Sequence, residues 1–308
     1  MNSLFAGSVA LKEEVTLFNR VSYSCGLYYE LCKPRIVAMV CVITALGFIL
    51  AGGNIFNSFA LFAMTVLGTV LTGAGSSALN QYIERDSDKL MDRTARRPLP
   101  SGKLAADSAL YFGLITILFG VAILVVGVNL LVGFLSLLTA FLYVLVYTPL
   151  KKITWINTTV GAIPGALPTV GGWVAVTGSI DLGAMVLFLI LFLWQHPHFF
   201  AIAWMYKDDY EKGGHAMLPV VDKTGKATFR QMSWYTHHLI LASILPVWFG
   251  LAGTSYLIGS ILAGAYFLVS TLEFYKSANR VTARKVVVAS LVYLPVLLGL
   301  VILEAWIS

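Results

Sequence analysis

The residues best suited to chemistry lie between positions 80 and 97, where acids and bases follow a long apolar segment. Four oxygen-bearing side chains recur there at intervals of four residues: Asn80, Glu84, Asp88 and Asp92. A continuous helix would place all four along one stripe, although like charges at this spacing repel each other. Oxygen donors followed by a cluster of arginines predict a bound cation beside a bound anion. The plainer interpretation is a membrane-interface loop with solvated charges, which suits a single Asp better than this spacing.

These side chains must be positioned by a membrane-embedded scaffold. The 308 residues are 58% hydrophobic and only 12% charged, whereas soluble domains carry about 25% charged residues. Runs of about 20 apolar residues are long enough to cross a bilayer, and they lack the period-2 alternation of a β-barrel. We therefore predict an all-α polytopic membrane protein with nine transmembrane helices. The nine runs are residues 36–54, 58–82, 107–127, 130–148, 155–176, 183–204, 234–252, 255–274 and 286–306.

The distribution of basic residues predicts the orientation. With nine spans, all 21 Lys and Arg fall on one side of the membrane, and the positive-inside rule makes that side cytoplasmic. We expect an N-terminal arm over residues 1–35, a single transmembrane domain over 36–308 with cytoplasmic loops at 83–106 and 205–233, and the C-terminus outside. The N-terminus has no cleavable signal pattern, so a bacterial inner (plasma) membrane is the simplest location. The rule accounts for the net charge of +6 without nucleic acid as a partner.

A second charged segment follows the sixth apolar run and contains Tyr206, Asp208, Asp209 and Lys212. Two acidic helix ends that face one another would form a site for Mg²⁺, which prefers carboxylates, water and substrate phosphates. A diphosphate also needs cations. Four are suitably placed in the sequence: Arg93, Arg97, Lys103 and Lys212. Taken alone, the second segment is equally consistent with a solvated loop.

Three further features leave alternatives open. The small residues from Gly73 to Ala78 allow either close helix packing or room for a bulky apolar ligand. His196 and His198 flank a proline within an apolar run, where an imidazole serves as a haem ligand, an acid–base group or a buried structural side chain. Lys151 either faces a phosphate or anchors its helix in the headgroups. The other three histidines, His215, His237 and His238, are interpreted as loop or interface residues.

Three stretches of the sequence carry a resemblance to a known family. The pattern Asn80-x3-Glu84-x3-Asp88-x4-Arg93, continuing through Arg97-Pro-Leu-Pro-Ser-Gly102, resembles the first acidic motif of the UbiA superfamily of intramembrane prenyltransferases. Tyr147-x3-Lys151 is similar to the Tyr-x3-Lys element of that superfamily. The resemblance extends from Lys33-Pro34-Arg35 to the last apolar run. The segment from Trp194 to Pro219 is similar to the haem O synthases, which are protohaem IX farnesyltransferases.

The resemblance implies a UbiA-type bundle that transfers farnesyl from farnesyl diphosphate to a vinyl group of haem b, with addition of water, to give haem O. It implies Mg²⁺ held by Asn80, Glu84, Asp88 and Asp209, with Asp208 beside them among the catalytic residues. The residues implied in substrate binding are Arg35, Arg93, Arg97, Lys103, Tyr147, Lys151, His198, Tyr206 and Lys212. Haem A synthase or a terminal oxidase assembly are the implied protein partners.

The chain also departs from the wider superfamily. Glu84 stands where an aspartate is usual, and the aspartates spaced DxxxD ahead of Asp208 and Asp209 are replaced by an aromatic stretch. This departure puts a second metal in doubt and is consistent with a porphyrin acceptor. Two other functions remain open: prenylation of an aromatic or quinone precursor, and transport. Transport is disfavoured because the acids crowd one face instead of lying at mid-depth.

Overall fold

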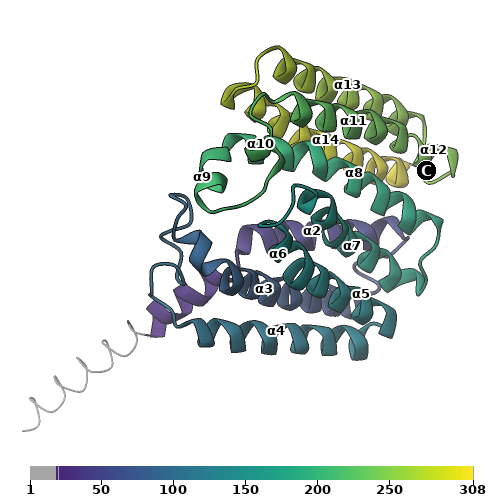
Figure 1. Ribbon diagram of the computed structural model, residues 1–308. Helices are drawn as coiled ribbons and strands as arrows, with labels where there is room; N and C mark the ends of the chain where they lie inside the picture. The colour runs from purple at the N-terminus through teal and green to yellow at the C-terminus, as the bar shows by residue number, and fades with distance from the viewer. Residues whose placement is uncertain (1–18, 20, 308) are drawn as a thin grey trace, which may run out of the picture.

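The computed structural model describes residues 19 and 21–307, and within this part of the chain every regular element is a helix (Figure 1). The all-α prediction is therefore confirmed. The first described helix is Val21–Leu31. It is followed by α2 (Pro34–Leu50), α3 (Phe59–Asp88), α4 (Ala106–Gly127), α5 (Leu130–Phe141), the π-helix η1 (Leu142–Tyr147), α6 (Thr148–Leu150), α7 (Asn157–Thr177), α8 (Leu182–Met205), α9 (Lys207–Lys212), α10 (Leu218–Val221), α11 (Lys226–Ala242), α12 (Leu245–Trp248), α13 (Thr254–Lys276) and α14 (Arg280–Ile307).

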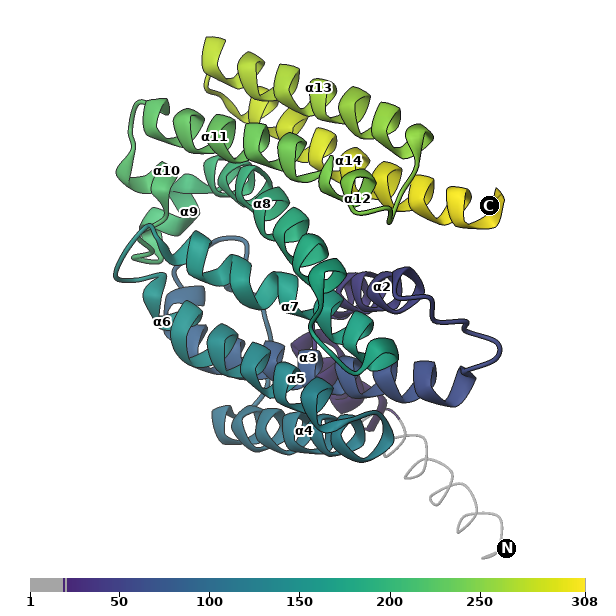
Figure 2. The same cartoon turned by 90° about the vertical axis from the view of Figure 1, so that its right-hand side faces the viewer.

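The helices form one bundle with two flanks. Figures 1 and 2 show α3, α4 and α5 on one side and α11, α13 and α14 on the other, with α2, α7 and α8 between them. The connections 89–105 and 206–225 lie at the same end of the bundle, called here the charged end. The long helices therefore present the two charged segments of the sequence to one another.

The predicted count of nine spans is not confirmed. Seven described helices are long and apolar enough to cross a membrane, or eight if Val21–Leu31 and α2, bent by 54°, form one span. The predicted segment 234–252 is divided between α11 and α12, and α11 begins eight residues earlier than predicted, at Lys226. Five of the first eight residues of α11 are polar, so this 17-residue helix is not apolar along its length. Residues 1–18 and 20 of the predicted arm lie outside the described residues.

Small residues bring α3 and α4 close together. A Cβ added to Gly75 would lie 2.6 Å from the carbonyl oxygen of Gly113, and one added to Gly120 would lie 2.8 Å from that of Gly68. Lipid tails are as apolar as side chains, so helices in a membrane associate through such close van der Waals contact. For Gly75, the structure thus supports close helix packing.

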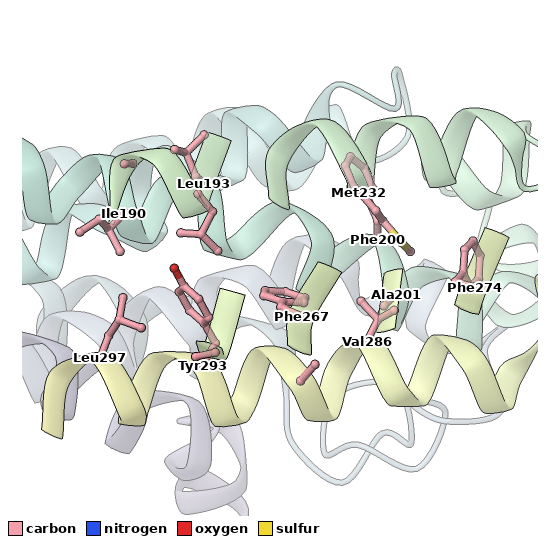
Figure 3. Packing of buried hydrophobic residues seen from close by; sticks show 14 of the residues in the cluster. Ile190, Leu193, Phe200, Ala201, Met232, Phe267, Phe274, Val286, Tyr293 and Leu297 are labelled. Atoms are coloured by element: carbon pink, nitrogen blue, oxygen red, sulfur yellow. The ribbon is translucent and has the colours of Figure 1, made fainter. Parts of the chain in front are cut away.

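The C-terminal flank is held by a separate apolar core. Figure 3 shows Phe200 of α8 and Met232 of α11 facing Phe267 and Tyr293 of α13 and α14. All four side chains are fully buried. The Tyr293 hydroxyl hydrogen-bonds to the Ser243 hydroxyl at 2.7 Å, which satisfies its one polar group. This core fixes α8 against α14, and the charged end of α8 leads directly into α9.

Candidate active site

The first acidic motif forms the last turns of α3. Because the helix continues to Asp88, Asn80, Glu84 and Asp88 lie on one stripe and are at most 5% exposed. Asp92 does not belong to this stripe, contrary to the sequence prediction. The helix ends at Asp88 and Asp92 follows in the turns beyond it, where its side chain is 82% exposed.

Each member of the stripe is contacted by a different cation. The three contacts are Lys33 Nζ to Asn80 Oδ1 at 2.6 Å, Lys151 Nζ to Glu84 Oε1 at 2.7 Å, and an Arg97 guanidinium nitrogen to Asp88 Oδ2 at 2.7 Å. Buried carboxylates require such partners because an unpaired buried charge is strongly destabilising. Lys151 and Arg97 offset the charges of the two carboxylates. Lys33 faces the neutral amide of Asn80, and burial lowers the pKa of Lys33 to about 7, so it adds a partial positive charge at neutral pH. An anion is therefore attracted to this end of the bundle.

Backbone irregularities position two of these cations. Lys33 lies at the bend before α2 and is the only non-glycine residue with a positive φ in the described chain, at 49°. Lys151 follows η1 and α6, where Thr148 Oγ1 donates to the Tyr143 carbonyl oxygen five residues back. The same hydroxyl accepts a hydrogen bond from Asn80 Nδ2 at 2.9 Å. A π-helical turn of this kind is often found at functional sites, and here it ties the Tyr-x3-Lys element to α3.

Lys151 is the most constrained of the cations. Its ammonium lies 4.7 Å from the centre of the Tyr147 ring, and its side chain is 13% exposed. Burial alone would lower the pKa of Lys151, but the Glu84 carboxylate outweighs burial and raises it. Lys151 is therefore fully charged at physiological pH. The alternative of a headgroup anchor is excluded for Lys151 in this structure because the ammonium points into the bundle.

The second charged segment contacts the turns after α3. The Arg93 guanidinium lies 5.2 Å from the Tyr206 ring centre and 5.7 Å from that of Tyr210. Lys212 pairs with Asp92 at 2.7 Å on the surface. Thus α9 lies against the first motif, as the paired-loop interpretation requires, and Asp92 serves as a surface partner of Lys212.

The remaining predicted site residues are more exposed. Asp209 is half-buried and Asp208 is exposed, and neither forms an ion pair with another described residue. Arg35 and Lys103 are exposed and likewise have no ion-pair partner in the described part of the chain. Among the described residues, no side-chain hydrogen bond or ion pair joins these four to the stripe.

Two residues near the stripe, Lys33 and His215, are not among the site residues predicted from the sequence. Lys33 had a usable signal, since it directly precedes the proline that begins the first apolar run. His215 is only 3% exposed, and its Nδ1 is buried without a hydrogen-bond partner. Burial lowers the pKa of His215, although the charge of Glu84 acts in the opposite direction. The next residue, Ala216, donates its amide to the Lys151 carbonyl oxygen at 2.6 Å, which places this loop against the end of α6.

The two histidines of α8 have different surroundings. His196 is fully buried, with Nδ1 2.7 Å from the Phe192 carbonyl oxygen and Nε2 3.3 Å from Thr159 Oγ1. His198 is half-buried, and its Nδ1 lies 2.7 Å from Ser290 Oγ on α14. His196 thus fits the structural interpretation, while His198 keeps one ring nitrogen unengaged by the described residues.

An apolar cavity of about 210 Å³ lies between α2, α7, α8 and α14. Its lining includes Ile43, Leu191 and Leu294, and towards the opposite end of the bundle Trp173 and Tyr256. The cavity occupies the interior between the two flanks, where an apolar chain would be shielded from water. The cavity borders the face of α8 that also carries His198. Leu191 of its lining lies about two helical turns farther from the charged end than His198 does.

The stripe on α3 has the donor chemistry of a magnesium site. Amide and carboxylate oxygens are ligands that Mg²⁺ accepts, with substrate phosphates completing its shell. The described residues contain no group of three or more His, Cys, Asp or Glu side chains that would hold a metal by themselves. The two carboxylates and the amide oxygen of the stripe are already paired with cationic side chains. They therefore fit a Mg²⁺ ion that is bound together with a phosphate ligand.

Residues 40–300 match the UbiA prenyltransferase family. The chain is 43% identical over 285 residues to a protoheme IX farnesyltransferase of Solibacter usitatus (strain Ellin6076), covering 90% of this chain and 98% of the relative. It is 41% identical over 277 residues to one of Salinibacter ruber (strain DSM 13855 / M31), covering 90% and 98%.

Solved structures share the fold at lower identity. A digeranylgeranylglyceryl phosphate synthase superposes with a TM-score of 0.75 at 20% identity, over 91% of this chain and 98% of that one. A UbiA homologue from Archaeoglobus fulgidus, solved with DMAPP and Mg²⁺, superposes with a TM-score of 0.65 at 17% identity, over 89% and 98%. These similarities show the same helical architecture.

Proposed function

Because the chain belongs to the UbiA prenyltransferase family, we propose that it transfers farnesyl from farnesyl diphosphate to a vinyl group of haem b, giving haem O and diphosphate. The relatives that cover most of the chain are named protoheme IX farnesyltransferases. The observation that carries the proposal is the buried stripe on α3 with its three cations. A prenyl diphosphate with its Mg²⁺ retains about one net negative charge, which would favour the charged form of Lys33 beside Asn80.

The charged end binds the diphosphate group. Lys151 and Arg97 supply donors whose positions are already fixed by Glu84 and Asp88, and such preorganised charges stabilise a developing anion without reorganisation. Lys33 and Arg93 complete the ring of cations, and Tyr206 holds the Arg93 guanidinium by its π-face. Asn80, Glu84, Asp88 and Asp209 would hold Mg²⁺, which would supply Lewis-acid stabilisation of the departing diphosphate.

The overall reaction consumes one water molecule. The C–O bond between farnesyl and diphosphate breaks, and its electron pair leaves with diphosphate. The terminal vinyl carbon of haem forms the new C–C bond to the allylic cation. Water then adds to the inner vinyl carbon and releases a proton, which leaves the hydroxyethylfarnesyl group. The allylic cation must be kept from premature hydration, and the apolar cavity farther from the charged end is suited to the remote part of the farnesyl chain.

We also propose that the charged end faces the cytoplasm of a bacterial inner membrane. The basic residues in the connections 89–105 and 206–225 favour this orientation, and farnesyl diphosphate and Mg²⁺ are both available there. The far end of the bundle would then face outwards, with the C-terminus.

The direct test is the mass of the product after incubation of the purified protein with haem b, farnesyl diphosphate and Mg²⁺. The expected product is haem O. Hydroxybenzoate serves as a second acceptor in a parallel reaction. Prenylation of hydroxybenzoate with no product from haem b would contradict the proposal and indicate a phenolic acceptor.

A further inference from the structure

Ser290 of α14 holds two aromatic rings of α8 with its two oxygen atoms. Its carbonyl oxygen accepts a hydrogen bond from Trp194 Nε1 at 2.8 Å, and its hydroxyl lies 2.7 Å from His198 Nδ1. Trp194 and His198 stack on one another, with ring centres 4.9 Å apart and planes 17° apart. The orientation of the His198 ring is therefore determined by a single residue of the neighbouring helix.

The hydrogen bonds of Ser290 also determine the tautomer of His198. The Ser290 hydroxyl donates its one hydrogen to the Val287 carbonyl oxygen at 2.6 Å, so towards His198 it can only accept. Nδ1 of His198 must then carry the proton. In the neutral imidazole this leaves the lone pair on Nε2.

Nε2 of His198 is accessible. It forms no hydrogen bond with any described residue, and it is not among the buried side-chain atoms of this part of the chain that lack a partner. His196, two residues earlier, has both ring nitrogens engaged and its ring stacked on Tyr235 at 3.5 Å. Helix α8 thus carries one histidine with both ring nitrogens hydrogen-bonded and one with a free lone pair on Nε2.

His198 shares a face of α8 with the lining of the apolar cavity. Leu191 and His198 are seven residues apart on α8, hence on one face and about 10 Å apart along the axis. Ser290 and Leu294 are one turn apart on α14 in the same way. Both leucines line the apolar cavity, so His198 and Ser290 occupy the cavity-facing sides of their helices, nearer the charged end.

We propose that Ser290 is a positioning residue that holds His198 in the Nδ1–H tautomer, so that Nε2 can bind the iron of the haem substrate. Histidines that bind metals donate their other ring N–H to an oxygen acceptor, which fixes the tautomer and raises the basicity of the ligating nitrogen. Here that acceptor is polarised by its own donation to the Val287 carbonyl oxygen. The inference depends on the proposed function because haem is the ligand.

The first part of the test needs no haem. Protein labelled with ¹⁵N-histidine should show His198 protonated at Nδ1, and Ser290→Ala should shift this residue towards the Nε2–H form. Ser270→Ala is the matched control, because Ser270 is also buried and its hydroxyl also donates to a backbone carbonyl, without a histidine beside it. An Nε2–H tautomer in the unmodified protein, or no change in Ser290→Ala, overturns the proposal.

The second part measures the affinity and absorption spectrum of added haem b. Loss of an outer-sphere partner weakens metal binding by about 10- to 100-fold, so Ser290→Ala should weaken haem binding by that factor and change the iron-ligand bands. Ser290→Thr, which keeps the acceptor, should restore both, and Ser270→Ala should change neither. Farnesyl diphosphate affinity should stay constant throughout. If haem O forms but haem affinity and spectrum are the same in Ser290→Ala, the positioning role fails alone; if no haem O forms in the unmodified protein, the proposed function fails.

Discussion

Replacing the partners of the Lys151–Glu84 pair by neutral residues, singly and together, separates the structural role of this contact from its role in catalysis. Three variants are needed: Glu84→Gln, Lys151→Met, and the combination of both. Gln and Met preserve the approximate length of each side chain and remove the charge. Each single variant leaves one charge buried without its partner, whereas the combined variant leaves neither.

The expected magnitudes follow from burial. The two side chains are 7% and 13% exposed and their charged atoms are 2.7 Å apart, so removing one partner should lower the free energy of unfolding by about 3–5 kcal/mol. The combined variant should recover most of this loss, because replacing both members of a buried pair is often close to neutral. Farnesyl transfer should be lost in all three variants, because both charges act on the Mg²⁺–diphosphate unit.

The assays are unfolding of the detergent-solubilised protein, followed by tryptophan fluorescence, and product mass with haem b and farnesyl diphosphate. Lys151→Arg is the conservative control, since it retains the charge. If the combined variant is destabilised by the sum of the two single effects, the pair does not exist in the folded protein. If it regains transfer together with stability, the contact is structural and the assignment to diphosphate is wrong.

Further predictions concern individual side chains. Asp88→Asn should reduce transfer by at least about 100-fold in a protein that still folds, and near-normal turnover in Mg²⁺ would refute the metal assignment. A chelator should abolish transfer and added Mg²⁺ restore it, whereas activity that persists after chelation excludes a metal requirement. Lys212→Gln should leave the midpoint of thermal unfolding almost unchanged, because its pair with Asp92 is exposed; a clear drop in the midpoint would contradict this. Burial lowers the pKa of His215, so the unfolded chain binds its proton more readily and stability should fall as the pH drops below about 6.5. His215→Gln should flatten this part of the pH–stability profile, and an unchanged profile would mean that His215 is not buried in solution.

The helical membrane fold could be predicted because each apolar run must satisfy its own backbone hydrogen bonds in lipid. The number of spans was harder to predict. Counting runs of about 20 apolar residues fails at two places. The first turns of α11 are mostly polar, and a bend separates Val21–Leu31 from α2. Their conformation depends on neighbouring helices, which a window along the chain does not contain.

The residue pattern was enough to predict that oxygen donors and cations gather at one end of a membrane bundle, because helical spacing aligns Asn80, Glu84 and Asp88 and because the basic residues cluster between the predicted apolar runs. Which partners meet depends on how the helices pack. The π-helical turn carries Lys151 to Glu84, the bend before α2 carries Lys33 to Asn80, and the packing of α14 on α8 gives His198 its partner. These contacts join residues 47 to 92 positions apart. Such contacts follow from helix packing, so no local pattern in the sequence could specify them.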